Sequence, residues 1–131
     1  TRKESSAASD VYKRQVETVN LLKQKEEPSD TDDPLAVASI WNGGNYLNLH
    51  LMPKTQGGTQ EWGYRSDSTR SSHTGTIYHL SLYHRQPGDP YSYSTTVYAS
   101  LPLLPLGLQE GDSIAFTILT FDGRKTWRFG F

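Results

Sequence analysis

Three stretches decide the fold: SIWNGGNYLNLHL (Ser39–Leu51), IYHLSLYHRQPGD (Ile77–Asp89) and YSTTVYASLPL (Tyr93–Leu103). In each stretch apolar and polar residues alternate, and residues that favour turns, such as Gly, Pro and Asn, interrupt or end the run. A period of two places successive side chains on opposite faces of a strand, so the alternation predicts half-buried β-strands. The interruptions predict tight turns between them.

The first stretch predicts a hairpin. Leu35–Trp41 is mostly apolar, and Tyr46–Met52 carries three leucines on one face. The NGGN sequence between them (42–45) tolerates the positive φ angles that a tight turn requires. We therefore expect valine at either Gly43 or Gly44 to destabilise the fold.

Further strands are predicted along the rest of the chain. They are Gln60–Arg65, Thr76–His84, Tyr93–Leu101, Ser113–Phe121 and Lys125–Phe131. Asp122-Gly123 is the strongest hairpin signal, because a type I′ turn favours Asp followed by Gly. Ser66–Ser72 is predicted to be an exposed loop. The sequence thus predicts an all-β fold, an antiparallel β-sandwich of about six to seven strands with a disordered or extended N-terminal segment.

The chain divides into three parts. Residues 1–15 show neither strand alternation nor a helical apolar stripe, and we interpret them as a non-native scar from a sequencing adapter or as a disordered tail. Residues 16–33 are interpreted as a linker with a short strand, VETVNLL, and an acidic stretch that self-repulsion keeps in solvent. Residues 34–131 form the folded domain, so deletion of residues 1–15 is expected to leave its stability unchanged.

Composition limits the functions open to the chain. Its 131 residues fit a single domain, and 11 Gly, 7 Pro and 8 Tyr favour β-structure over a helical bundle. A net charge of −1 provides no basic field for nucleic acid. The absence of cysteine excludes disulfides, thiolate metal sites and cysteine nucleophiles.

No metal site is predicted from the four histidines. His79 and His84 lie five positions apart on one predicted strand, so their side chains point to opposite faces. His50 approaches His79 only if their strands pair in register, and His73 lies beside a loop. We therefore expect ordinary surface or strand-edge histidines, without the three or four convergent ligands that zinc requires. The acidic stretch also lacks the glycine and final glutamate of an EF-hand loop.

No catalytic constellation is predicted either. The chain has no G-x-S-x-G sequence to present a serine nucleophile. Asp89, Asp112 and Asp122 sit in predicted turns, where a carboxylate caps the local backbone, so they are not expected to face one cleft as paired catalytic acids. We therefore predict a protein that is not an enzyme and has no cofactor.

Aromatic residues at or near predicted loops form the candidate ligand or partner surface. They are Trp41, Tyr46, Trp62, Tyr64, Tyr91 and Tyr93. Trp and Tyr rings stack on sugar rings or on partner side chains. In the competing interpretation Trp41 is a core residue, and Trp62 and Tyr64 cover the end of the sandwich. Exposed, coplanar rings would favour a sugar, whereas a contiguous apolar patch or a bare sheet edge would favour a protein.

From Asp33 onward the chain resembles the C-terminal domain of the NigD-like proteins of Bacteroides-type bacteria. The resemblance rests on DPLAVASIWNGGNYLNLHL (33–51), HLSLYH followed by GD (79–89), YASLPL (98–103) and the final KTWRFGF. It covers about three quarters of the chain, and the order and spacing of these motifs are more specific than any one of them.

The resemblance implies an N-terminally truncated envelope lipoprotein, in the outer membrane or periplasm. Family members carry a signal peptide, a lipid-anchored cysteine and a small N-terminal β domain before the β-sandwich, and any membrane association would run through that anchor. It further implies a bacteriocin-associated accessory role, in which the domain interacts with another protein. A carbohydrate-binding module is the alternative, so the expected partner is a protein or a glycan.

Overall fold

The computed structural model describes residues 16–21, 23–26 and 32–131. The interpretation of residues 1–15 as a scar or tail lies outside the described residues. Part of the acidic stretch does as well, between residues 27 and 31.

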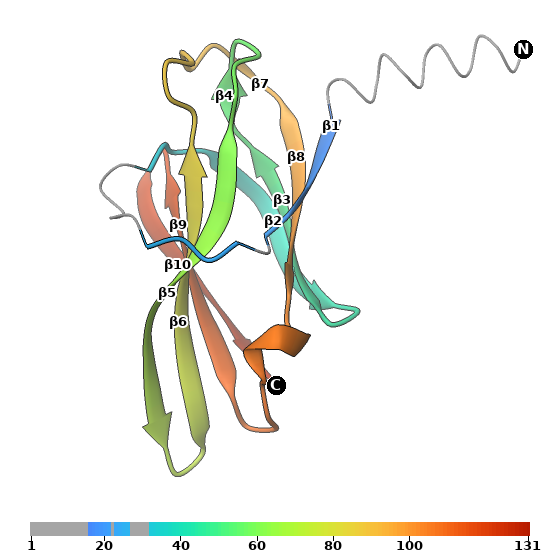
Figure 1. Cartoon of the computed structure of the whole chain (residues 1–131), viewed down its shortest axis with the longest axis vertical. Helices are drawn as coiled ribbons and strands as arrows, with labels where there is room; N and C mark the ends of the chain where they lie inside the picture. Colours follow the sequence, from blue (N-terminus) through green and yellow to red (C-terminus); the bar gives the residue numbers. More distant parts are fainter. Residues whose placement is uncertain (1–15, 22, 27–31) are drawn as a thin grey trace, which may run out of the picture.

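Two four-stranded sheets face each other (Figure 1). Sheet A has the order β1 (Val16–Asn20), β8 (Thr96–Pro102), β3 (Tyr46–Met52), β2 (Ala36–Gly43). Sheet B has the order β10 (Gly123–Gly130), β9 (Ser113–Thr120), β6 (Gly75–Arg85), β5 (Glu61–Ser72). A small third sheet pairs β4 (Lys54–Thr55) with β7 (Tyr93–Ser94), and a 3₁₀ turn, η2 (Leu104–Leu106), follows β8. The all-β sandwich predicted from the sequence is thereby confirmed.

Most neighbouring strands are antiparallel, but two pairs are parallel. β1 runs parallel to β8, and β6 runs parallel to β9. The partners of each parallel pair are distant in sequence, and the connections between them pass through the opposite sheet. Such long connections permit parallel pairing, whereas a short hairpin turn enforces the antiparallel arrangement.

The core lies between the sheets and is built from the alternating positions of their strands. Its buried members are Leu21, Leu35, Leu47, Leu49, Leu51, Leu80, Leu82, Val97, Ala99, Leu101, Leu103, Ile114, Phe116 and Ile118. The expected inward faces of Tyr46–Met52 and Ser113–Phe121 are thus confirmed. Trp127 and Phe129 of β10, together with Phe131 directly after it, pack against this core while remaining partly exposed.

The β2–β3 hairpin has the tight turn expected of the NGGN sequence. Gly43 pairs with Tyr46, and the two central residues, Gly44 and Asn45, have φ angles of 61° and 64°. Positive φ at both central positions is the type I′ geometry. Gly43 itself lies in β2 without a positive φ angle, so the prediction that valine at Gly43 would strain the turn is wrong.

The β9–β10 hairpin is confirmed, although its turn is not of type I′. Gly123 pairs with Thr120, and the two residues between them, Phe121 and Asp122, do not have positive φ angles. The positive φ, 104°, belongs to Gly123. A left-handed glycine directly after a two-residue loop is typical of a type I turn with a bulge.

Strand β5 continues through the segment that the sequence predicts to be a loop. Residues up to Ser72 pair with β6 as far as Gly75, with a register irregularity between Ser66 and Ser68. Alternation is missing there because side chains on both faces of this part of the edge strand are exposed. Because both faces of this part of β5 are polar, the sequence shows no alternation there from which a strand could be predicted.

The described parts of the 16–33 segment connect the two sheets. Asn20 ends β1 in sheet A, and Leu21, fully buried, donates a backbone hydrogen bond of 2.8 Å to Ser100. Gln24 then bridges to Tyr64 at the edge of sheet B. This segment is thus part of the packed structure as well as a connection.

The expectation that the acidic stretch stays in solvent is wrong at Asp32. Its carboxylate forms a bidentate pair with the Arg65 guanidinium, with both N–O distances 2.7 Å. The side chains are only 2% and 6% exposed, respectively. Arg65 supplies the opposite charge that relieves the self-repulsion expected from the sequence alone.

Candidate functional site

The outer face of sheet A carries a group of exposed rings. Because Leu47, Leu49 and Leu51 point inward, the alternate residues of β3 point outward. Register brings outward residues of β2 and β8 beside them. We call this the outer aromatic face and define it as Trp41, Tyr46, Asn48, His50 and Tyr98.

Three of these rings are accessible to a ligand. Trp41 is 45% exposed, Tyr46 41% and Tyr98 40%. His50, opposite Tyr98 in the register, lies with its ring centroid 4.7 Å from the tyrosine ring. The exposed rings thus lie on one face of three adjacent strands, where aromatic side chains can meet a ligand or a partner.

Polar groups fix the surface between the rings. Asn48 Nδ2 donates to the Gly43 carbonyl at 3.2 Å, and Ser100 Oγ donates to Asn48 Oδ1 at 3.4 Å. Both the nitrogen and the oxygen of the Asn48 side-chain amide therefore form hydrogen bonds. The face combines rigid rings with a fixed amide and a hydroxyl group.

The six aromatic residues predicted as a surface occupy different places in the structure. Trp41 and Tyr46 share the outer aromatic face, so Trp41 is not a core residue. Trp62 and Tyr64 are half-buried on the inward side of β5 and pack against the core, in agreement with the competing interpretation. Of the six residues, the structure brings only Trp41 and Tyr46 together on the outer aromatic face, and their role in binding stays a prediction.

Tyr91 and Tyr93 lie on the connection between β6 and β8. Tyr93 is 59% exposed, and the Tyr91 hydroxyl donates to Asp33 Oδ1 at 2.5 Å. Burial of the hydroxyl, together with the hydrogen bond to the Asp33 carboxylate and its charge, raises the pKa of Tyr91 to about 12. Tyr91 therefore remains a neutral donor that ties this loop to the start of the folded domain.

Tyr98, His50 and Asn48 were not among the residues predicted from the sequence. Asn48 and His50 alternate with the three leucines of β3, and Tyr98 lies between Val97 and Ala99, so the signal was present in the alternation. Their proximity depends on sheet order, because β3 pairs with β8 from the far part of the chain. Alternation alone gives no information on which strands are neighbours.

His84 corrects the expectation of ordinary surface histidines. It is 1% exposed and stacks on Trp62 with ring centroids 4.4 Å apart. Its Nδ1 lies 2.9 Å from the Asp33 carbonyl, and its Nε2 lies 2.9 Å from the Gln60 side chain. Burial lowers the pKa of His84, outweighing the opposing effect of that carbonyl.

The remaining expectations for the histidines agree with the register. His84 shares the inward side of β6 with Leu82, and His79 lies on the other side, opposite Ala115. His50 and His79 belong to different sheets and are not paired. Among the described residues, no group of three or more His, Asp or Glu side chains is placed to hold a metal ion.

Two of the turn aspartates accept hydrogen bonds from backbone amides, but only Asp112 has a local partner of the kind expected, Gln109, whereas Asp89 accepts from partners 33 and 34 positions away in sequence. Asp89 accepts from the Gln56 amide at 2.7 Å and from the Thr55 hydroxyl, and these hydrogen bonds lower its pKa. Asp112 accepts from the amides of Thr76 and Gln109 at 2.9 and 2.8 Å. Both carboxylates thus hold separate loops together.

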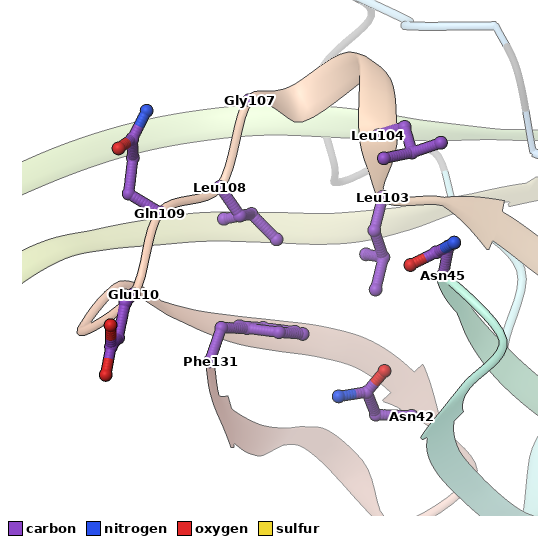
Figure 2. A pocket seen from close by; sticks show the side chains of 9 residues that line it. All are labelled: Asn42, Asn45, Leu103, Leu104, Gly107, Leu108, Gln109, Glu110 and Phe131. Atoms are coloured by element: carbon purple, nitrogen blue, oxygen red, sulfur yellow. The ribbon is translucent and has the colours of Figure 1, made fainter.

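Two hollows lie at loop clusters. One, of about 360 Å³, is lined by Asp33, Gln86 and the loop 87–91. The other, of about 550 Å³, lies between the β2–β3 turn, the segment after β8 and the end of β10 (Figure 2). Neither includes a residue of the outer aromatic face, so that face is a surface site separate from both.

Comparison with known proteins decides the family. Residues 17–131 match the profile described as "NigD-like C-terminal beta sandwich domain". The chain belongs to this NigD-like family. No curated protein matches the chain. Within the described parts of the chain, no helix is long and apolar enough to cross a membrane.

Solved structures of similar shape come from related bacteria. A NigD-like immunity protein from Bacteroides caccae is 27% identical, with 88% of this chain and 59% of that chain covered at a TM-score of 0.64. A protein described as toxin-related, from Parabacteroides distasonis, is 16% identical, with 87% and 60% covered at a TM-score of 0.63. A candidate lipoprotein from Bacteroides fragilis is 12% identical, with 87% and 68% covered at a TM-score of 0.51. The latter two matches support the fold alone.

The NigD-like chain spans about six tenths of the length of the first two solved structures. Its comparison with them therefore concerns the β-sandwich, which is the part that carries the outer aromatic face.

Proposed function

We propose that this NigD-like domain is a non-enzymatic binding domain of an envelope lipoprotein, and that it holds a protein partner on its outer aromatic face. The observation that carries the proposal is the exposure of Trp41, Tyr46 and Tyr98 on the same face of one sheet. Tyr and Trp are the residues most enriched at the energetic centres of protein interfaces.

The edge of sheet A supports a protein partner. β2 is the last strand of that sheet, and its sequence AVASIWNG contains no charged residue or proline. Charged residues, prolines and β-bulges protect edge strands against pairing with another chain, and the register irregularity of β2 lies between Val37 and Ser39, before Trp41. Trp41 belongs to this strand, so a partner on the edge would also reach the aromatic face.

The similar structures support the biological setting. The relative from Bacteroides caccae is named as an immunity protein. From that name we propose a bacteriocin or a component of its export or uptake as the class of partner.

A glycan is the second candidate for the same face. The observation that favours it is the fixed amide of Asn48 and the Ser100 hydroxyl between the rings. Hydroxyl-rich sugars use both stacking and hydrogen bonds of this kind.

Site-specific photo-crosslinking in living cells tests the proposal. A photoreactive phenylalanine replaces Tyr98 on the aromatic face or Thr126, an exposed control on β10, in the natural full-length protein of a Bacteroides host. We expect a discrete protein adduct from position 98 that position 126 does not give. The adduct should disappear in a Trp41→Ala background. Equal adducts at both positions, or quenching of Trp fluorescence by polysaccharide without a protein adduct, would refute the protein-binding proposal.

A further inference from the structure

The larger hollow, which we call the end pocket, lies where the two sheets separate at one end of the sandwich. It is lined by Asn42, Asn45, Leu103, Leu104, Gly107, Leu108, Gln109, Glu110 and Phe131. Its volume of about 550 Å³ falls within the range of about 300–1,000 Å³ typical of small-molecule sites.

Hydrogen bonds hold the walls of the end pocket in place. The Leu103 amide donates to the Asn45 carbonyl at 3.0 Å, which ties the β2–β3 turn to the segment after β8. The Phe131 amide donates to Asp112 at 2.8 Å, and its carbonyl accepts from Gly111 at 2.8 Å. Phe131 is thus fixed at both backbone groups. A pocket formed in advance spares a ligand the entropy of ordering it.

The lining combines an apolar floor with free amides. In Figure 2 the ring of Phe131 lies with Leu103 and Leu108 around the hollow, and the amides of Asn42 and Asn45 face it from the β2–β3 side. Within the described part of the chain, these two side-chain amides form no hydrogen bond with other residues. Each amide offers donors and an acceptor, which is the pattern that hydroxyl groups require.

Charge in the end pocket disfavours anions. Its lining contains no Lys, Arg or His, and Glu110 at the rim has no ion-pair partner among the described residues. A phosphate or carboxylate would meet a like charge there without compensation. Leu104 is 76% exposed at the mouth, which leaves an apolar side chain for a ligand to cover.

We propose that the end pocket binds one uncharged sugar ring of a glycan. Phe131 stacks on the apolar face of the ring, Asn42 and Asn45 bond its hydroxyls, and Leu104 covers its edge. This site is separate from the outer aromatic face and does not depend on the protein contact proposed for that face.

Amide chemical-shift mapping on the full chain tests the proposal. The probes are neutral gluco-, manno- and xylo-oligosaccharides, with an oligogalacturonate as the anionic comparison. We expect at least one neutral probe to shift the backbone amides of Asn45, Gly107 and Phe131. Asn42→Leu, which keeps the branched shape of the side chain but removes the amide, should weaken binding about tenfold. Leu104→Arg should abolish it, whereas Thr126→Arg, on the exposed side of β10, should leave it unchanged.

Several outcomes would overturn the proposal. Shifts confined to residues around Trp41 and Tyr98 would instead place a glycan on the aromatic face. Stronger binding of the oligogalacturonate, or no shift with any neutral probe, would show that the chemistry of the lining has been misassigned. Wild-type affinity in Asn42→Leu, in a variant with an unchanged thermal midpoint, would exclude the assigned hydrogen bonds.

Discussion

At the scale of single residues, Gly43 and Gly44 are neighbours with different conformational demands. Gly44 has a φ angle of +61°, whereas Gly43 lies in a strand, where an added Cβ would be in ordinary contact, 3.7 Å from the Trp41 ring. We expect Gly44→Val to lower the free energy of unfolding by about 1–3 kcal/mol, since a β-branched residue is strained at positive φ. Gly43→Val should be close to neutral, because valine favours strands.

Chemical denaturation of the two variants measures this difference. An equal decrease in the free energy of unfolding of the two variants would mean that the turn does not require a left-handed residue at Gly44. A lower free energy of unfolding in Gly43→Val alone would show that the strained position is Gly43, in β2.

His84 gives the molecule a dependence on pH. Its pKa is lowered in the folded state, while the unfolded chain retains the ordinary value of about 6.5. Below that pH the unfolded state takes up a proton that the folded state excludes, so this contribution to stability is lost as the pH falls. Between pH 8 and pH 5 we expect a decline in the free energy of unfolding.

The pH dependence is tested by denaturation of the wild type and of His84→Leu at several pH values. His84→Leu should reduce the slope below pH 6.5, even if it lowers stability throughout, because no proton is then excluded. An unchanged slope in His84→Leu would assign the effect to other groups.

At the scale of elements, the β5–β6 hairpin rests on the loop before β9. A Cβ added to Gly75 would lie 2.1 Å from the Gly111 carbonyl oxygen. The same loop is tied to the hairpin through the hydrogen bond from the Thr76 amide to Asp112. The close approach of two backbones therefore requires glycine at this position.

We expect Gly75→Ala to destabilise the domain more than Gly88→Ala. Both glycines have positive φ angles, 143° and 72°, but nothing lies within 4 Å of a Cβ at Gly88. Gly88→Ala should cost about 1–2 kcal/mol from the left-handed conformation alone, and Gly75→Ala should add about 1–3 kcal/mol from the clash. Thermal unfolding of both proteins makes the comparison, and a smaller loss at Gly75 would contradict the close contact.

The elements also indicate how far the sequence could predict this structure. Alternation located the strands with one buried face, such as Ser113–Phe121, because burial imposes a period of two. It failed for the second half of β5, where neither face is buried. It placed Tyr98 outward but could not place it beside His50, since that requires the pairing of β3 with β8.

The buried polar groups and the end pocket were beyond prediction for a related reason. Asp32 and Arg65 are 33 positions apart in sequence, and only the assembled fold brings them together. The burial of His84 likewise depends on Trp62 being its partner across the β5–β6 pair. The end pocket combines residues from three separate parts of the chain. Contacts between residues so far apart in sequence produce no local sequence pattern from which they could be predicted.

At the scale of the whole molecule, β1 is expected to be essential to the sandwich. A chain that begins at residue 16 should keep the thermal midpoint of the full chain, as the sequence analysis expects. A chain that begins at residue 22 loses β1 and the fully buried Leu21. Removal of one such buried leucine side chain costs about 2–5 kcal/mol, so we expect a large fall in the midpoint or loss of folding.

Calorimetry of the two truncated chains distinguishes these cases. A lower midpoint for the chain that begins at residue 16 would show that residues 1–15 contribute to the fold. Equal midpoints for both chains would show that β1 is dispensable.

The parallel pairing of β1 with β8 has a mechanical consequence. Val16–Asn20 pairs with Thr96–Ser100 along its whole length, and Leu21 follows directly in the core. Tension applied at Val16 along the strand axis loads these hydrogen bonds together in shear and does not peel them apart singly. For β1 to slide along β8, the Leu21 side chain must also leave the core. A domain held under tension from this side therefore resists unravelling at the point where the force enters.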